Sequence, residues 1–200
     1  IRNAKRLAFA DDASQDEIIF DDIGASDAEE LNFISSSDLL DSSVFVNFGW
    51  GRNPEGNARE GTFYIDQGVA YSGSTTAIGE APLAEPGYVQ PSAQFGRDPA
   101  GGFIAITGPV AAPTSLLSVT TLFGDLPSGR VFATTAPLSS VDSPVYEVSL
   151  IDANGASVTL GDLVGGGRAD PRFFTFPNGD AGVLLERSGD YFRIAEVATD

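Results

Sequence analysis

The sequence predicts an all-β protein. Its 23 glycines and 12 prolines separate short apolar runs at close intervals, which is typical of antiparallel strands joined by turns. With 200 residues, of which 42% are hydrophobic, the chain can bury a substantial core, so we do not expect disorder. No apolar run approaches the roughly 18 residues that a membrane span requires.

Three strand-like runs separated by polar turns open the chain: Arg6–Ala10, Glu17–Phe20 and Glu30–Ile34. They predict one antiparallel meander. The segment Ser35–Val44 allows a helical turn or an irregular loop, because Ser37-Asp38 is a candidate N-cap before two leucines.

The region 46–100 is long and rich in Gly, Pro and polar residues, and only Thr62–Ile65 and Gly87–Val89 have the pattern of strands. Such stretches are uncommon in compact domains. Two interpretations stay open: a decorative loop, or the rim or entrance of a site.

Strand-like runs return after residue 100 in two groups of four. Counting the opening meander as the first unit, the second unit is Gly102–Thr107, Val119–Phe123, Arg130–Thr134 and Val145–Leu150. The third unit is Ser157–Leu160, Arg172–Phe176, Gly182–Glu186 and Tyr191–Ile194. Asn178-Gly179 and Ser188-Gly189-Asp190 suit tight hairpins because these residues tolerate positive φ.

The sequence therefore predicts about three four-stranded antiparallel units, at approximately 1–45, 46–153 and 154–200, the first one short of a strand. This spacing is typical of the blades of a β-propeller. Because propellers typically have four to eight blades, three cannot close a ring. We expect the remaining blades on residues outside these 200 or on another copy.

The formal net charge is -17 with only 11 Lys plus Arg, which disfavours nucleic acid and membrane partners. The charge favours solubility in a salty medium or the capture of a cation, mainly calcium. The chain has no Cys and no His, which excludes disulfides, thiolate sites and a Ser-His-Asp triad within these residues. Because Met is also absent, we expect that residue 1 is not the biological start.

Five segments in chain order carry a resemblance to a known family: Ile1–Phe9, Asp21–Asn32, Val46–Trp50 with Pro54–Gly56, Ile106–Pro109 with Leu122–Val131, and Gly167–Phe173 with Asn178-Gly179. Together they resemble the C-terminal half of the glucose/sorbosone dehydrogenase-like six-bladed β-propellers. That family includes soluble PQQ-dependent sugar dehydrogenases and hedgehog-interacting-protein-like domains.

PQQ is a flat tricarboxylate, so its site needs guanidinium groups, and calcium bridges protein carbonyls to the quinone oxygens. The resemblance implies cofactor contacts from Arg2, Asn3, Arg168 and Arg172, and calcium-binding carbonyls on Gly24 and Ala25. An alternative stays open, in which Arg2 or Arg172 simply pairs with one of the 28 acidic residues.

In the sugar dehydrogenases the general base is a histidine from an earlier blade, so the catalytic residue is unknown here and we expect this chain alone to be inactive. The segment Gln94–Gly102 also replaces an aromatic residue and a His found in many relatives. The leading hypothesis is part of a periplasmic or secreted PQQ/calcium-dependent dehydrogenase of a sugar or polyol, partnered by the N-terminal half of the propeller on the same or another chain. The alternative is a non-catalytic propeller that binds a protein or glycan.

Overall fold

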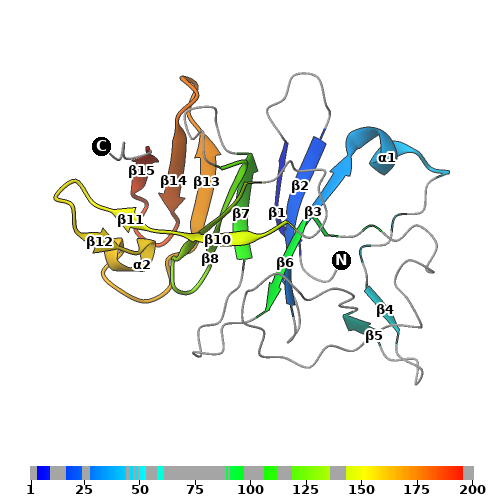
Figure 1. Ribbon diagram of the computed structural model, residues 1–200, viewed down its shortest axis with the longest axis horizontal. Helices are drawn as coiled ribbons and strands as arrows, with labels where there is room; N and C mark the ends of the chain where they lie inside the picture. The colour runs from blue at the N-terminus through cyan, green and yellow to red at the C-terminus, as the bar shows by residue number, and fades with distance from the viewer. Residues whose placement is uncertain are drawn as a thin grey trace.

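The computed structural model describes residues 4–9, 17–23, 28–43, 46, 48, 50–52, 58–60, 89, 91–96, 106–111, 119–135 and 143–195. Within these residues the chain is all-β, with several small antiparallel sheets and two short helices (Figure 1). Neither helix is long and apolar enough to cross a membrane. The all-β prediction is confirmed.

Three sheets make up most of the described structure. Sheet 1 has the order β1-β2-β3-β6, sheet 2 the order β7-β8-β9-β10, and sheet 3 the order β13-β14-β15. Sheet 1 comprises β1 (Ala4–Phe9), β2 (Glu17–Asp22), β3 (Ala28–Ser35) and β6 (Ala93–Gly96). Sheet 2 comprises β7 (Ile106–Ala111), β8 (Thr121–Asp125), β9 (Val131–Thr134) and β10 (Val145–Val148). Sheet 3 comprises β13 (Pro171–Thr175), β14 (Ala181–Leu185) and β15 (Tyr191–Ile194).

Smaller elements join these sheets. Two hairpins are formed by β4 (Trp50–Arg52) with β5 (Ala58–Glu60), and by β11 (Leu150–Ile151) with β12 (Ser157–Val158). The helices are α1 (Ser36–Leu40), after β3, and α2 (Leu160–Leu163), after β12.

The first strands of the three sheets are neighbours in space. Strand β7 contacts β1 and β2 of sheet 1, and β13 contacts β7 and β8 of sheet 2. Figure 1 shows β1, β7 and β13 near the centre, with β2 and β3 on one side and β14 and β15 on the other. Each sheet thus meets the next near the strand with which it begins.

An apolar seam joins sheets 2 and 3. Its buried side chains are Leu122, Val131 and Ala133 of sheet 2, Phe173, Ala181, Val183 and Leu185 of sheet 3, and Leu160 and Ala169 between them. Within it Gly124 permits a close approach, because a Cβ there would lie 2.7 Å from the Pro171 Cγ. We call this cluster the seam.

Sheet 1 has a separate, smaller cluster. Ile18, Phe20 and Ile34 pack with Phe48, whose ring meets that of Phe20 edge-on at a centroid distance of 4.9 Å. The alternation along β2 and β3 explains the cluster, because residues two apart share one face of a strand.

Two predictions in the first unit need correction. The helical turn is present, but its N-cap is Ser35 rather than Ser37-Asp38: the Ser35 hydroxyl accepts a bond from Asp38 N at 3.0 Å. The unit is not short of a strand either, because β6 pairs with β3. This four-residue edge strand lies inside 46–100, where the pattern predicted loop, and Thr62–Ile65 lies outside the described residues.

The run Ser157–Leu160 was expected as a strand of the third unit, but it divides into two elements. Strand β12 pairs with β11, and the chain then turns into α2. A capping box causes the turn: Thr159 N donates to Asp162 Oδ2 at 2.7 Å, and Asp162 N donates to Thr159 Oγ1 at 3.1 Å. Among the described residues sheet 3 therefore has three strands, not four.

Candidate functional site

The turn between β8 and β9 anchors the segment that carries the predicted cofactor arginines. The buried Asp125 carboxylate accepts bonds from the Ser128 hydroxyl and, at 3.0 Å, from Ser128 N. Gly129 has a φ of +71°, and a Cβ there would overlap Gly161 N. Its carbonyl accepts from Leu160 N at 3.0 Å, so the turn also fixes the start of α2.

The segment 168–172 is held from both sides. Asp170 N donates to the carbonyl of Leu126 at 3.1 Å, and the carbonyl of Asp170 accepts from Glu186 N at 3.3 Å. Asp170 has a φ of +46° and is the only non-glycine residue with positive φ in the described part of the chain. Aspartate tolerates this conformation better than most residues. Main-chain hydrogen bonds to Leu126 and Glu186 therefore fix the backbone that carries the two arginines.

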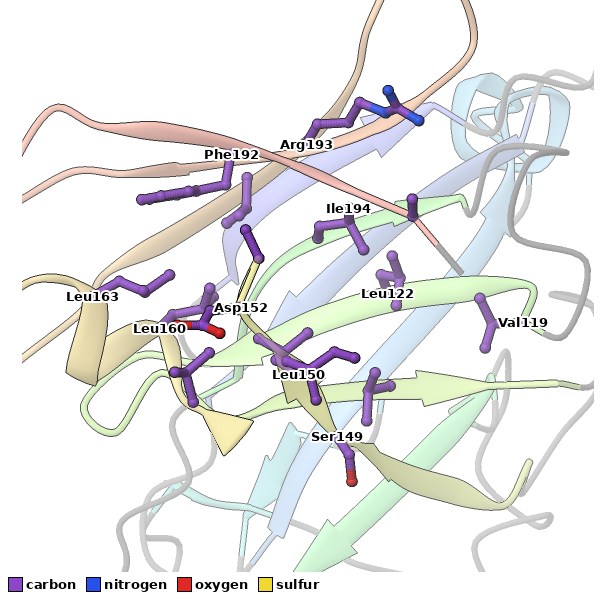
Figure 2. Close-up of a pocket in the computed structure, with 16 residues that line it drawn as sticks. Val119, Leu122, Ser149, Leu150, Asp152, Leu160, Leu163, Phe192, Arg193 and Ile194 are labelled. Carbon is purple, nitrogen blue, oxygen red and sulfur yellow. The ribbon is translucent and has the colours of Figure 1, made fainter. Parts of the chain in front are cut away.

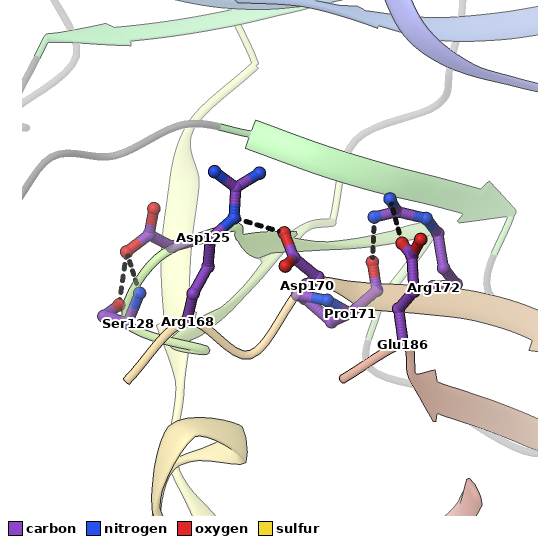
Figure 3. Close-up of polar contacts among 7 residues, drawn as sticks. All are labelled: Asp125, Ser128, Arg168, Asp170, Pro171, Arg172 and Glu186. Carbon is purple, nitrogen blue, oxygen red and sulfur yellow. Dashed lines mark hydrogen bonds and ion pairs between the residues drawn. The ribbon is translucent and has the colours of Figure 1, made fainter. Parts of the chain in front are cut away.

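Both arginines are ion-paired (Figure 3). Arg168 Nε lies 2.6 Å from Asp170 Oδ1, and the Arg168 side chain is 59% exposed. Arg172 Nη2 lies 2.6 Å from Glu186 Oε2, with a side chain that is 24% exposed, and its Nη1 donates to the Pro171 carbonyl at 3.1 Å. The alternative pairing raised for Arg172 is thus present. An anionic ligand would bind here either by sharing the two guanidinium groups with these carboxylates or by displacing the carboxylates.

A third arginine, Arg187, contacts the residues just before this segment. Arg187 Nη1 donates to the carbonyl of Gly166 at 2.8 Å. Gly167 has a φ of +82°, and a Cβ there would displace that guanidinium. Residues 166–172 thus contain or contact three arginines and two carboxylates, Asp170 and Glu186, in a chain that is strongly acidic overall.

Sequence reasoning missed three of these residues. Asp170 has a local signal, since it lies between Arg168 and Arg172. Glu186 and Arg187 have none, because they reach the site only through the antiparallel register of β13 and β14, which sets Pro171 opposite Leu185.

Sheet 1 holds a second polar group. Asp21, Asp22, Glu29 and Glu30 are buried, with exposed fractions between 0% and 6%, and they lie on strands β2 and β3, before and after residues 24–27 in the chain. Asp22 is directly opposite Glu30 in the register. Burial of several carboxylates is costly unless cations or hydrogen bonds offset their charge.

Asn32 adjoins these carboxylates. It is fully buried, and its Nδ2 donates to Glu30 Oε2 at 3.4 Å. Its Oδ1 has no hydrogen-bond partner among the described residues. Carboxylate, amide and main-chain oxygens are the donors that calcium prefers, so the chemistry of this region fits that ion. Three or more His, Cys, Asp or Glu side chains in metal-binding geometry do not occur in the described part of the chain.

The predicted site residues are thus only partly described. Arg168 and Arg172 lie in one segment, whereas Arg2, Asn3, Gly24 and Ala25 lie outside the described residues. Comparison of the chain with family models, with curated proteins and with solved structures gives no match. The functional proposal therefore depends on the residues themselves.

Proposed function

We propose that this chain is the C-terminal half of a six-bladed β-propeller in a periplasmic or secreted PQQ/calcium-dependent dehydrogenase of a sugar or polyol. The observation that carries the proposal is the placement of Arg168 and Arg172 at the start of β13, where the first strands of the three sheets are neighbours. Three meanders that meet at their first strands also suit the propeller architecture.

In this proposal the arginines bind the cofactor carboxylates. Asp170 and Glu186 hold the two guanidinium groups in place beforehand, so that less side-chain entropy is lost when a ligand binds. Charge-assisted bonds from Arg to a carboxylate are the strongest polar contacts available to this surface. When bound, PQQ would supply the quinone that accepts a hydride from the substrate hydroxyl.

The calcium ion is assigned to residues 24–27, with Gly24 and Ala25 offering carbonyls. Support comes from the carboxylates of Asp21, Asp22, Glu29 and Glu30 on either side of these residues, because oxygen is the ligand atom that calcium prefers. The general base that removes the hydroxyl proton is assigned to the other half of the propeller, since this chain has no histidine.

The first experiment measures PQQ binding to the 200-residue chain with calcium and with a chelator. We expect binding only with calcium, and a loss of about tenfold or more in affinity for Arg168→Ala and Arg172→Ala, because hydrogen bonds to charged groups contribute roughly 1.5–3 kcal/mol. Arg193→Ala is the matched control, since Arg193 is also ion-paired on sheet 3, with Asp180 at 3.1 Å. The proposal fails if the chain does not bind PQQ or if the three variants behave alike.

Activity needs the complete protein. The chain combined with the N-terminal half, loaded with PQQ and calcium, should reduce a redox dye when sugars or polyols are supplied. The absence of histidine here favours one alternative, a propeller that binds a protein or glycan without chemistry. Glycan or protein binding that needs neither PQQ nor calcium, together with no turnover, would establish that alternative.

A further inference from the structure

An apolar groove lies beside β15, at the outer end of the seam (Figure 2). It has a volume of about 820 Å³ and is an open groove rather than an enclosed cavity. Its walls include Val148 of β10, Leu150 of β11, Leu160 and Leu163 of α2, and Phe192 and Ile194 of β15. All but the fully buried Leu160 are partly exposed side chains that pack against the seam, so the groove continues the core outward.

The outer edge of β15 borders this groove. Sheets 1 and 2 each have a fourth strand, whereas β15 ends sheet 3 among the described residues. Leu185 N donates to the carbonyl of Asp190 at 2.8 Å, which fixes the alternation of the ladder. Because hydrogen-bonded and non-hydrogen-bonded pairs alternate in antiparallel strands, Tyr191 and Arg193 direct their main-chain N–H and C=O away from β14.

Two apolar side chains of β15 lie on the face of sheet 3 that borders the groove. Phe192 lies opposite Val183 and Ile194 opposite Ala181, so both share the face of sheet 3 that forms the seam. A strand added beyond β15 would place every second side chain on that same face. Those side chains would enter the groove, towards Val148 and Leu150.

We propose that the outer edge of β15 and the adjoining groove bind an extended segment of a partner polypeptide as a fourth strand of sheet 3. Main-chain bonds to Tyr191 and Arg193 give affinity, and alternate aliphatic side chains in the groove give selectivity, as in other cases of strand addition. The segment carries basic residues at its ends, because the chain has a net charge of -17. The groove wall itself holds one carboxylate, Asp152, and one guanidinium, Arg193.

The test uses a seven-residue peptide that alternates valine and threonine between terminal lysines, titrated into the 200-residue chain by calorimetry. We expect saturable binding with one site, and binding about tenfold weaker or worse when glutamates replace the lysines. Arg193→Pro removes the outward N–H without touching the bonds to β14 and should abolish binding. Arg193→Ala removes only the side chain and should leave affinity within about twofold.

A second probe does not require a variant to fold. The same peptide methylated on the backbone nitrogens that face β15 keeps its side chains but cannot donate to the edge, and we expect no binding. Equal binding of both peptides, or of Arg193→Pro and Arg193→Ala, would overturn strand addition. Dimerisation of the chain that Arg193→Pro abolishes and the peptide does not compete with would instead make a second copy the occupant. None of these measurements involves PQQ, so they succeed or fail independently of the proposed dehydrogenase.

Discussion

The seam between sheets 2 and 3 and the polar end of sheet 1 are both built from antiparallel strands, but they differ in the side chains that they bury. The seam packs apolar side chains, and strand β8 also buries one carboxylate, Asp125, whereas β2 and β3 bury four carboxylates and an amide beside their apolar cluster. In the seam, the strand pattern of the sequence and the packing of the sheets both favour apolar side chains. Such agreement is typical of a stable core. Each of the four carboxylates of sheet 1 interacts with another group, and departures from an apolar core are typical of functional sites.

The largest expected effect tests the seam as the source of stability. Phe173→Ala should lower the free energy of unfolding by about 3–5 kcal/mol, because it leaves a cavity among fully buried side chains. Denaturant unfolding followed by circular dichroism measures it. Tyr191→Ala is the control: Tyr191 is on the same sheet but 68% exposed, so its loss should cost less than about 1 kcal/mol. Similar values for both would show that the seam does not dominate stability.

The next effect concerns the turn that joins the seam to the arginine segment. Gly129→Ala should cost about 2–3 kcal/mol, because the new Cβ meets the backbone of Gly161 at a φ of +71°. Gly155 has a φ of +83° with nothing within 4 Å, so Gly155→Ala should cost only about 1 kcal/mol. The difference between the denaturation midpoints of the two variants separates the cost of the contact with Gly161 from the cost of the positive φ. If the costs are equal, the close packing of the turn against α2 contributes nothing.

A smaller effect of opposite sign tests sheet 1. Asn32→Leu should raise the free energy of unfolding by up to about 1 kcal/mol in the absence of calcium, because it removes a buried carbonyl oxygen that has no described partner. With calcium present, the melting temperature of the natural chain should rise more than that of the variant. A variant that is less stable than the natural chain without calcium would mean that the bond from Asn32 Nδ2 to Glu30 outweighs the cost of the unpaired Asn32 oxygen.

The contrast between the two regions also explains what the sequence could predict. The sequence predicts the strand Tyr191–Ile194 and the hairpin turns at Gly179 and Gly189. It can do so because alternating apolar residues and residues that tolerate positive φ are local signals. Strand β6 was missed because a short edge strand held by pairing to β3 has little pattern of its own. The end of β12 was missed because the capping box of Thr159 and Asp162 competes with the strand pattern.

The candidate site shows the same division. Arg168 and Arg172 were selected by resemblance, and the structure places both in one segment. Their partners were less accessible to prediction: Asp170 is a near neighbour in sequence, but Glu186 meets Arg172 across a hairpin. Contacts that depend on register between distant strands follow from the fold, not from spacing along the chain.

The smallest effect concerns the acid sensitivity of the seam edge, where Leu160 enters the core from α2. Hydrogen bonds from Thr159 N and Oγ1 hold the pKa of Asp162 below its ordinary value. A carboxyl whose pKa is lower in the folded state adds stability above its unfolded pKa, and that stability is lost as the pH falls through the folded pKa. The melting temperature of Asp162→Asn should therefore lie slightly below that of the natural chain at pH 7, and the two should converge once the pH has fallen through the folded pKa of Asp162.

Asp41→Asn separates this effect from general acid sensitivity. The side chain and backbone of Ser43 lower the pKa of Asp41, and Asp41 ends α1, next to sheet 1. Both variants should show the same sign of pH dependence, but only Asp162→Asn should speed amide hydrogen exchange at Leu160 and Leu163, because only that carboxylate caps the helix at the seam. Equal exchange rates in the two variants would show that the capping box does not hold α2 against the seam.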